Sequence, residues 1–200
     1  MKDNALIILI RNPILGCVKT RLATDIGDAK ALQIYKVLLK YTYSITREVQ
    51  CSRLLFYSDF IDENDDWGTD NFTKFLQVGS SFGERMRQAF EVALENHAKA
   101  VIIGSDCTEL TPEIIREAFN QLDAFDVTLG PAKDGGYYLL GLKKVYPELF
   151  MNKQWSTSTV FSDTINDINR LGLSLFLLPV LSDIDNFDDL KNSRLFEKAY

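Results

Sequence analysis

The stretch that decides the fold runs from Ala5 to Leu22 and reads ALIILIRNPILGCVKTRL. Its first six residues are a continuous apolar run of strand length, which predicts a strand buried on both faces. A loop follows, expected to reach about Ile26, and Pro13 and Gly16 shape its backbone. Three cations flank this loop: Arg11, Lys19 and Arg21. Loop amides form anion-binding concavities, and Lys and Arg add charge-assisted hydrogen bonds, so the loop predicts a phosphate site. The plain alternative is a solvated basic loop.

Beyond this stretch, apolar runs of strand length alternate with segments of helical periodicity. The expected strands cover residues 54–57, 72–78, 100–103, 126–129, 137–142 and 173–180. The expected helices begin at Asp28, at Phe82, after a Thr111 cap with Pro112 in the first position, at Val160 and at Asp188. The alternation indicates βαβ units and therefore a three-layer α/β/α fold with a mostly parallel sheet. No linker or repeat interrupts the chain, so one domain over residues 1–200 is the simplest organisation.

Composition excludes several classes of protein. A net charge of -6 argues against a nucleic-acid binder, which normally carries a basic excess. The apolar run before Arg11 is too short for a signal peptide or a membrane span. The three cysteines fit no metal spacing and are expected to be reduced thiols, so we expect a cytoplasmic protein.

Two common motifs are matched incompletely. A P-loop requires Gly immediately before the Lys, and this chain has Val18 before Lys19. Residues 79–83 read GSSFG, which matches the nucleophile elbow of esterases. A triad built on this elbow requires an Asp or Glu later in the chain, followed by a His. The only histidine, His97, precedes every suitable late acid, so this order is not met. We therefore expect neither a P-loop nor an esterase, and no G-x-G-x-x-G dinucleotide motif follows the first strand.

Acidic residues follow two of the expected strands. Asp106 comes just after the strand that ends at Ile103, and Asp183 and Asp185 come just after the last strand. The carboxyl ends of parallel strands meet at one edge of the sheet, and oxygen ligands there suit Mg²⁺ or Mn²⁺. We therefore predict a metal site at Asp106 and Asp185, with Asp183 as the reserve ligand. The alternative is that Asp106 caps a turn and that Asp183 or Asp185 caps the last helix.

Taken together, these pieces resemble the nucleotide-diphospho-sugar transferase superfamily, the GT-A fold. More narrowly, the chain is similar to a bacterial family of small glycosyltransferases associated with radical-SAM or selenium-related genes, and to the phospholactate guanylyltransferases. The motifs that carry the resemblance are Asn12-Pro13 with Gly16 and residues 18–22, Gln77 with Gly79 and residues 83–86, residues 104–107, Gly130-Pro131 with residues 134–137, residues 155–157, and residues 183–185 with 188–190. The chain departs from the family pattern at Arg11, where a Lys is more frequent, and at Thr108, where a Pro is usual.

The resemblance implies roles that spacing alone does not give. It implies a nucleotide-binding set of Asn12, Gly16, Lys19, Thr20, Arg21, Gln77, Gly79, Gly83 and Arg85, in which Gln77, Gly79 and Gly83 border the base. It implies an acceptor site of Asp134, Gly135, Gly136, Tyr137 and Trp155. It also implies metal ligation by Asp106 and Asp185, and a catalytic set of Lys19, Arg21 and Asp106.

These roles predict a metal-dependent transferase that uses an activated nucleotide donor and a small-molecule acceptor. The resemblance favours glycosyl transfer from a nucleotide sugar. The basic loop favours the alternative, nucleotidyl transfer that releases pyrophosphate from a nucleoside triphosphate, because three phosphates need more cations. A third possibility is a non-catalytic nucleotide-binding scaffold, although such a protein need not keep two metal-binding acids.

Overall fold

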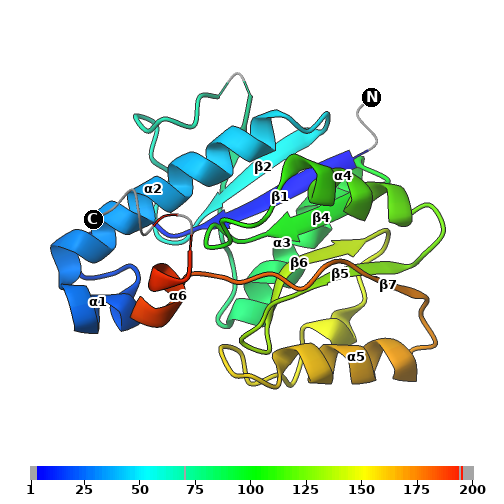
Figure 1. Ribbon diagram of the computed structural model, residues 1–200. Coiled ribbons are helices and arrows are strands. Elements are labelled where there is room, and N and C mark those ends of the chain that lie inside the picture. The colour runs from blue at the N-terminus through cyan, green and yellow to red at the C-terminus, as the bar shows by residue number, and fades with distance from the viewer. Residues whose placement is uncertain (1–3, 70, 194, 196–200) are drawn as a thin grey trace.

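The computed structural model describes residues 4–69, 71–193 and 195, and its centre is a seven-stranded sheet (Figure 1). The strand order is β3-β2-β1-β4-β6-β5-β7. The strands are β1 (Asn4–Ile10), β2 (Ser52–Tyr57), β3 (Thr73–Leu76), β4 (Lys99–Ile103), β5 (Val127–Pro131), β6 (Tyr137–Leu142) and β7 (Leu175–Leu177). Strand β6 pairs antiparallel with β4 and β5, and the other pairings are parallel. The prediction of a mostly parallel sheet is confirmed.

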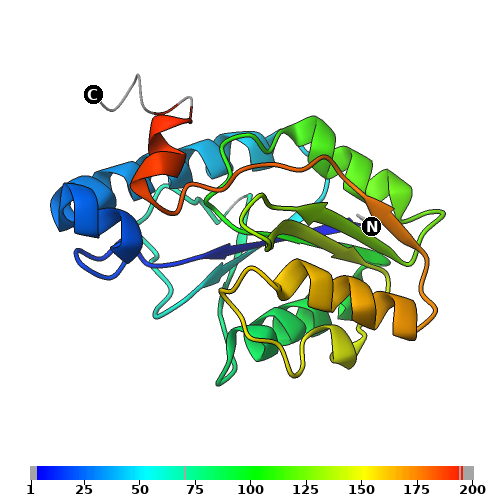
Figure 2. The ribbon, with the colours of Figure 1, turned by 60° about the horizontal axis from the view of Figure 1, so that its bottom comes forward.

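Helices cover both faces of the sheet (Figure 2). They are α1 (Thr20–Ile26), α2 (Asp28–Arg47), α3 (Phe82–Asn96), α4 (Pro112–Gln121), α5 (Val160–Arg170) and α6 (Phe187–Lys191), with a 3-10 turn at Pro147–Leu149. Successive residues of β1 point to opposite faces, so Leu6 and Ile8 pack with α2 and α4, and Ala5 and Ile7 pack with α3 and α5. Both cores are apolar, which confirms the α/β/α layers and a first strand buried on both faces.

Several expected boundaries were wrong. The loop after β1 ends at Lys19, because α1 occupies residues 20–26. A seven-residue helix with Leu22 as its buried residue presents no apolar stripe that a sequence pattern could reveal. Asp28 was expected to cap α2, but it is the first residue of the helix. The residue in the cap position is Gly27, with φ 81°. The last strand contracts from residues 173–180 to Leu175–Leu177, because the chain then leaves the sheet.

Two expected helix ends were correct. Thr111 caps α4, accepting a hydrogen bond from the Ile114 amide, and Pro112 occupies the first turn. Gly172, with φ 66°, follows α5. None of the three cysteines forms a disulfide. No described helix is long and apolar enough to cross a membrane. One domain over residues 1–200 stays a prediction, because that span includes residues outside the described ranges.

The topology brings several segments of the chain to one edge of the sheet. Strand β1 lies between β2 and β4, so the strands that follow it in the chain are added first on one side of β1 and then on the other. Such a switch point leaves a crevice at the carboxyl ends of the strands. Because β6 is antiparallel, its first residues reach the same edge, with Leu139 opposite Ile103 of β4. The segment after β7 crosses this edge, where the Ile184 amide donates a 3.0 Å hydrogen bond to the Asp106 carbonyl.

Candidate active site

A cavity of about 650 Å³ lies at this carboxyl edge. Its walls come from the loop after β1, the ends of β2 and β3, the start of α3, the residues after β4, the start of β6 and the segment after β7. Most of the residues singled out from the sequence line it: Lys19, Thr20, Arg21, Gln77, Arg85, Asp106, Asp134, Gly136, Tyr137, Trp155 and Asp185. Residues far apart in the chain therefore share one cavity, and their individual roles stay predictions.

The other predicted site residues do not line the cavity: Asn12, Gly16, Gly79, Gly83 and Gly135. Asn12 is 1% exposed and is bound to the loop after β2. Its side-chain oxygen accepts from the Asp59 amide at 3.0 Å, and its side-chain nitrogen donates to the Phe60 carbonyl at 2.9 Å. Asn12 thus joins two neighbouring loops of the site, and its role in nucleotide binding stays a prediction.

Two of these glycines allow close packing behind the cavity wall. A Cβ on Gly83 would lie 2.2 Å from the Phe150 carbonyl oxygen and 2.7 Å from Nε1 of Trp155. A Cβ on Gly135, where φ is 89°, would lie 2.2 Å from the Ser158 carbonyl oxygen. Their absent side chains let Trp155 and the segment 156–159 approach α3 and β6, so these glycines shape the site indirectly.

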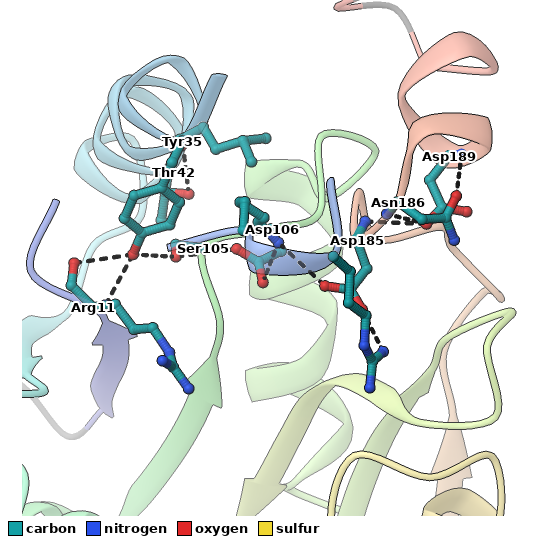
Figure 3. Close-up of polar contacts among 11 residues, drawn as sticks. Arg11, Tyr35, Thr42, Ser105, Asp106, Asp185, Asn186 and Asp189 are labelled. Carbon is teal, nitrogen blue, oxygen red and sulfur yellow. Dashed lines mark hydrogen bonds and ion pairs between the residues drawn. The ribbon is translucent and has the colours of Figure 1, made fainter. Parts of the chain in front are cut away.

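An ion-pair network joins the basic loop to the acids. The Lys19 Nζ lies 2.8 Å from Asp106 Oδ2 and 3.9 Å from Asp185 Oδ1, and the Arg21 Nη1 lies 2.6 Å from Asp185 Oδ2 (Figure 3). The side chain of Lys19 is 4% exposed, whereas that of Arg21 is 64% exposed. Lys19 also adopts a left-handed backbone conformation, with φ 49°, at the start of α1. The buried cation therefore lies between the two carboxylates that the sequence assigned to a metal.

Asp183 differs from the other acids because its Oδ1 is buried without a hydrogen-bond partner. Burial raises the pKa of Asp183 to about 7, and the negative charges of Asp106 and Asp134 add to this effect. An unpaired buried carboxylate oxygen beside two further acids fits a site that a cation completes. Within residues 4–69, 71–193 and 195, no three acids, cysteines or histidines converge closely enough to hold a metal alone. A divalent ion here would therefore need additional ligands from outside the protein, such as water molecules or phosphate oxygens.

The segment that carries Asp185 is fixed by the start of α6. The Asp189 Oδ2 accepts from the amides of Asp185 and Asn186, each at 3.0 Å, and the Asn186 Oδ1 accepts from the amides of Asp188 and Asp189 (Figure 3). Asn186 is therefore the helix cap in a capping box. The alternative reading, in which Asp183 or Asp185 caps this helix, is wrong, and both carboxylates are left to face the cavity.

A buried tyrosine links the first loop to Asp106. The Tyr35 hydroxyl accepts a 2.8 Å hydrogen bond from the Arg11 amide and lies 3.1 Å from the Arg11 carbonyl oxygen and 3.3 Å from Ser105 Oγ (Figure 3). Ser105 Oγ in turn lies 3.4 Å from Asp106 Oδ1. Burial and the charge of Asp106 raise the pKa of Tyr35, so it remains a neutral hydroxyl. Tyr35 thereby joins the ends of β1 and β4.

Several lining residues were missing from the sequence-based site, among them Arg11, Tyr35, Ser58, Phe82 and Ser105. Arg11 was recognised as a loop cation, and Tyr35 fits the apolar stripe of α2, where its hydroxyl carries no separate signal. Ser58 and Ser105 follow β2 and β4, so their positions just after predicted strands were the available indication.

Solved structures show the class of fold. The chain is similar to a protein from Desulfovibrio desulfuricans G20 provisionally named a nucleotide-diphospho-sugar transferase, with 27% identity, a TM-score of 0.87, and coverage of 98% of this chain and 90% of that one. An inositol-1-phosphate CTP transferase from T. maritima matches at 15% identity, with a TM-score of 0.63 and coverage of 99% and 95%. Rv0371c from Mycobacterium tuberculosis H37Rv, solved with manganese, matches at 12% identity, with a TM-score of 0.57 and coverage of 96% and 97%. The fold is that of the nucleotide-diphospho-sugar transferases.

A family model identifies the particular group. The bacterial family described as "Uncharacterized protein conserved in bacteria (DUF2064)" matches residues 41–157, and the chain belongs to this family. The match covers Asp106, Tyr137 and Trp155, whereas Lys19 and Asp185 lie outside it. No curated protein matches the chain by sequence. The narrower resemblance to transferases of radical-SAM or selenium-related contexts stays a prediction.

Proposed function

We propose that this protein transfers a nucleotidyl group from a nucleoside triphosphate to a small-molecule acceptor and releases pyrophosphate. The observation that carries the proposal is the charge arrangement of the cavity. Four cations, Arg11, Lys19, Arg21 and Arg85, line the same cavity as four acids, Asp106, Asp134, Asp183 and Asp185. A triphosphate presents its charge along three phosphates, and an array of cations opposite carboxylates suits a phosphate chain together with a metal.

Each of these residues has its own role in the proposed reaction. Lys19 and Arg21 bind phosphate oxygens and stabilise the charge that develops on the leaving pyrophosphate. Asp106 and Asp185 would hold the divalent ion, with Asp183 beside them. The ion, when bound, neutralises phosphate charge and makes the phosphorus more electrophilic. The acceptor hydroxyl oxygen attacks the α-phosphorus and loses its proton to solvent. The bond between the α-phosphorus and the bridging oxygen breaks, and pyrophosphate leaves with both bonding electrons.

Proteins of similar fold support this reaction class. The T. maritima structure is named a CTP transferase, and a CMP:2-keto-3-deoxy-manno-octonic acid synthetase solved with CTP has a TM-score of 0.58 to this chain at 10% identity. Manganese in the Rv0371c structure supports the metal. Glycosyl transfer from a nucleotide sugar is the second candidate, and the name of the Desulfovibrio relative favours it.

Calorimetric titration with the four common nucleoside triphosphates and with nucleotide sugars, each with and without Mn²⁺, tests the proposal. We expect at least one triphosphate to bind more tightly than its nucleotide sugar, and excess chelator to weaken it at least tenfold. Asp106→Asn and Asp185→Asn should each remove this metal dependence. Asp25→Asn, an exposed acid on α1, is the matched control and should behave like wild type.

The outcomes separate the candidates. Tighter binding of a nucleotide sugar than of any triphosphate would favour glycosyl transfer. Metal-independent binding that both Asn variants retain would favour a non-catalytic scaffold. If none of these nucleotides binds, the proposed function is wrong.

A further inference from the structure

The cavity has two chemically different halves, on opposite sides of Asp106. Sheet order places β1, β2 and β3 on one side of β4, and β6 on the other. The first half is polar, with Arg11, Ser58 and Gln77 after β1, β2 and β3. The second half contains the apolar side chains of Phe82, Met86, Tyr137 and Trp155, called the aromatic wall below, beside the polar residues Asp134, Ser156 and Thr157. A reaction between two substrates at Asp106 needs one binding region on each side.

Packing holds the aromatic wall in a defined shape. The rings of Phe82 and Trp155 are 5.3 Å apart at 78°, and those of Tyr137 and Trp155 are 6.4 Å apart, also at 78°. Both are edge-to-face arrangements of the kind that aromatic pairs prefer. Gly83 lets the Trp155 ring lie directly against the backbone of α3. Phe82 remains 47% exposed, so the wall keeps apolar surface that a ligand could cover.

The Tyr137 hydroxyl adds a polar group to this wall. Its hydrogen bond is to the Met86 sulfur, at 3.9 Å, and a thioether is a weak acceptor. A buried tyrosine hydroxyl normally has an oxygen or nitrogen partner. The hydroxyl is therefore available to donate a stronger hydrogen bond to a ligand that enters this half.

Charge near the wall is unfavourable for a phosphate. The cations of the cavity belong to the other half: Arg11, Lys19 and Arg21 come from the loop after β1, and the Arg85 Nε donates to the Gly79 carbonyl at 3.2 Å, in the turn after β3. The charged group that accompanies Tyr137 in the chain is the Asp134 carboxylate, which accepts a 2.8 Å hydrogen bond from the Gly136 amide. A phosphate at the wall would meet like charge without a compensating cation among the described lining residues.

We propose that the aromatic wall binds the acceptor, and that the acceptor is an uncharged ring compound with an apolar face and a hydroxyl group. The ring packs on Phe82 and Trp155, Tyr137 donates a hydrogen bond to a polar substituent, and the hydroxyl oxygen reaches the phosphorus near Asp106. The nucleobase occupies the polar half, where Gln77 and Ser58 lie. This inference rests on the proposed nucleotide-dependent reaction and specifies its second substrate.

The test uses calorimetric titration of the whole protein, saturated with its preferred triphosphate and Mn²⁺, with three probes. Benzyl alcohol represents an aromatic ring, methyl β-glucoside an uncharged sugar ring, and glucose 1-phosphate a phosphorylated acceptor. We expect one of the two neutral probes to bind, glucose 1-phosphate to bind more weakly, and Phe82→Ala to weaken the neutral probe about tenfold. Tyr137→Phe should weaken it several-fold. Phe60→Ala is the control, because Phe60 is 49% exposed and lies outside the cavity lining.

Triphosphate affinity distinguishes failure of this inference from failure of the proposed function. Phe82→Ala should bind the triphosphate as wild type does. A tenfold loss would show that the wall holds the base, which overturns the inference and leaves the proposed function intact. Tighter binding of glucose 1-phosphate than of both neutral probes, or no binding of either neutral probe, would also overturn it.

Discussion

Lys19 lies between the carboxylates of Asp106 and Asp185, with its Nζ 2.8 Å from one and 3.9 Å from the other. Two carboxylates at such a site would otherwise repel each other. Lys19 therefore supplies positive charge between them. In the proposed function the same ammonium group would also contact phosphate oxygens.

We expect Lys19→Met to weaken triphosphate binding more than tenfold and Arg21→Ala to weaken it less. Lys19 is nearly buried, whereas Arg21 is 64% exposed and its charge is screened by solvent. Methionine suits the test because it is unbranched at Cβ and tolerates the left-handed backbone about as well as lysine. Calorimetric titration measures both variants, with the exposed Lys36→Ala as control. Wild-type affinity in both variants would show that the first loop is not the phosphate site.

Tyr35 offers a second prediction, because its hydroxyl joins Arg11 to Ser105 beside Asp106. Tyr35→Phe should lower the free energy of unfolding by about 1–2 kcal/mol, since the Arg11 amide loses its partner. It should also raise the Mn²⁺ concentration needed for triphosphate binding several-fold. Tyr41→Phe is the matched control: Tyr41 lies on the same helix and donates to the Leu110 carbonyl at 2.8 Å. If Tyr35→Phe and Tyr41→Phe change the metal dependence equally, the Tyr35 hydroxyl does not position Asp106 for the metal.

Among the elements, α5 is joined to the loop before it by an ion pair. The Lys153 Nζ, with its side chain 1% exposed, lies 2.5 Å from Asp167 Oδ2, and Arg170 lies 2.8 Å from the other oxygen. Burial by itself would raise the pKa of Asp167, but the hydrogen bonds and charges of Lys153 and Arg170 outweigh it, so the pKa is lowered. This ion pair attaches the segment that carries Trp155 to α5, so it helps to hold the aromatic wall in position.

The pair predicts a pH-dependent stability difference. At pH 7, Asp167→Asn should lower the free energy of unfolding by about 2–3 kcal/mol, because a buried ammonium loses its charged partner. The folded pKa lies below the unfolded value of 3.8, so the carboxylate stabilises the fold above that value, and its contribution disappears as the pH falls through the folded pKa. Urea unfolding between pH 7 and pH 3 should therefore show the two proteins converging. Asp163→Asn, on the same helix, is the control, and a pH-independent difference would contradict the explanation.

At the scale of the whole molecule, an acidic protein brings charges from both ends of its sequence to one cavity. The first loop supplies cations, and the segment before α6 supplies acids, with α1 and α6 on the same side of the sheet (Figure 2). The net charge of -6 is therefore a poor guide to the cavity. In the proposed function, metal and nucleotide would each supply the charge that the other needs in this cavity, so we expect their binding to be coupled.

Thermal unfolding measures this coupling. We expect Mn²⁺ alone and triphosphate alone to raise the melting temperature little, and the two together to raise it by about 5–10 °C at roughly 100 times the dissociation constant. Excess chelator should reverse the shift in melting temperature. In Asp185→Asn, the shift with both ligands should equal the sum of the shift with Mn²⁺ alone and the shift with triphosphate alone. Additive shifts in the wild-type protein would contradict a shared site.

Sequence alone determined the layers and most of the site's composition. Buried parallel strands read as continuous apolar runs, so β1 and β4 were recognisable, and residues that follow such strands must reach one edge of the sheet. For that reason the sequence predicts that Lys19, Asp106 and Asp185 lie near one another.

Tertiary structure decided how these residues pair. Sequence spacing gives no distances between segments 80 or more residues apart, so the position of Lys19 between Asp106 and Asp185 could not be derived from it. Short elements such as α1 and β7 depend on contacts with the rest of the fold and carry little periodic signal of their own. The role of Tyr35 and the unpaired oxygen of Asp183 depend on burial by several segments at once. These features arise from packing, and packing joins residues that the order of the chain keeps apart.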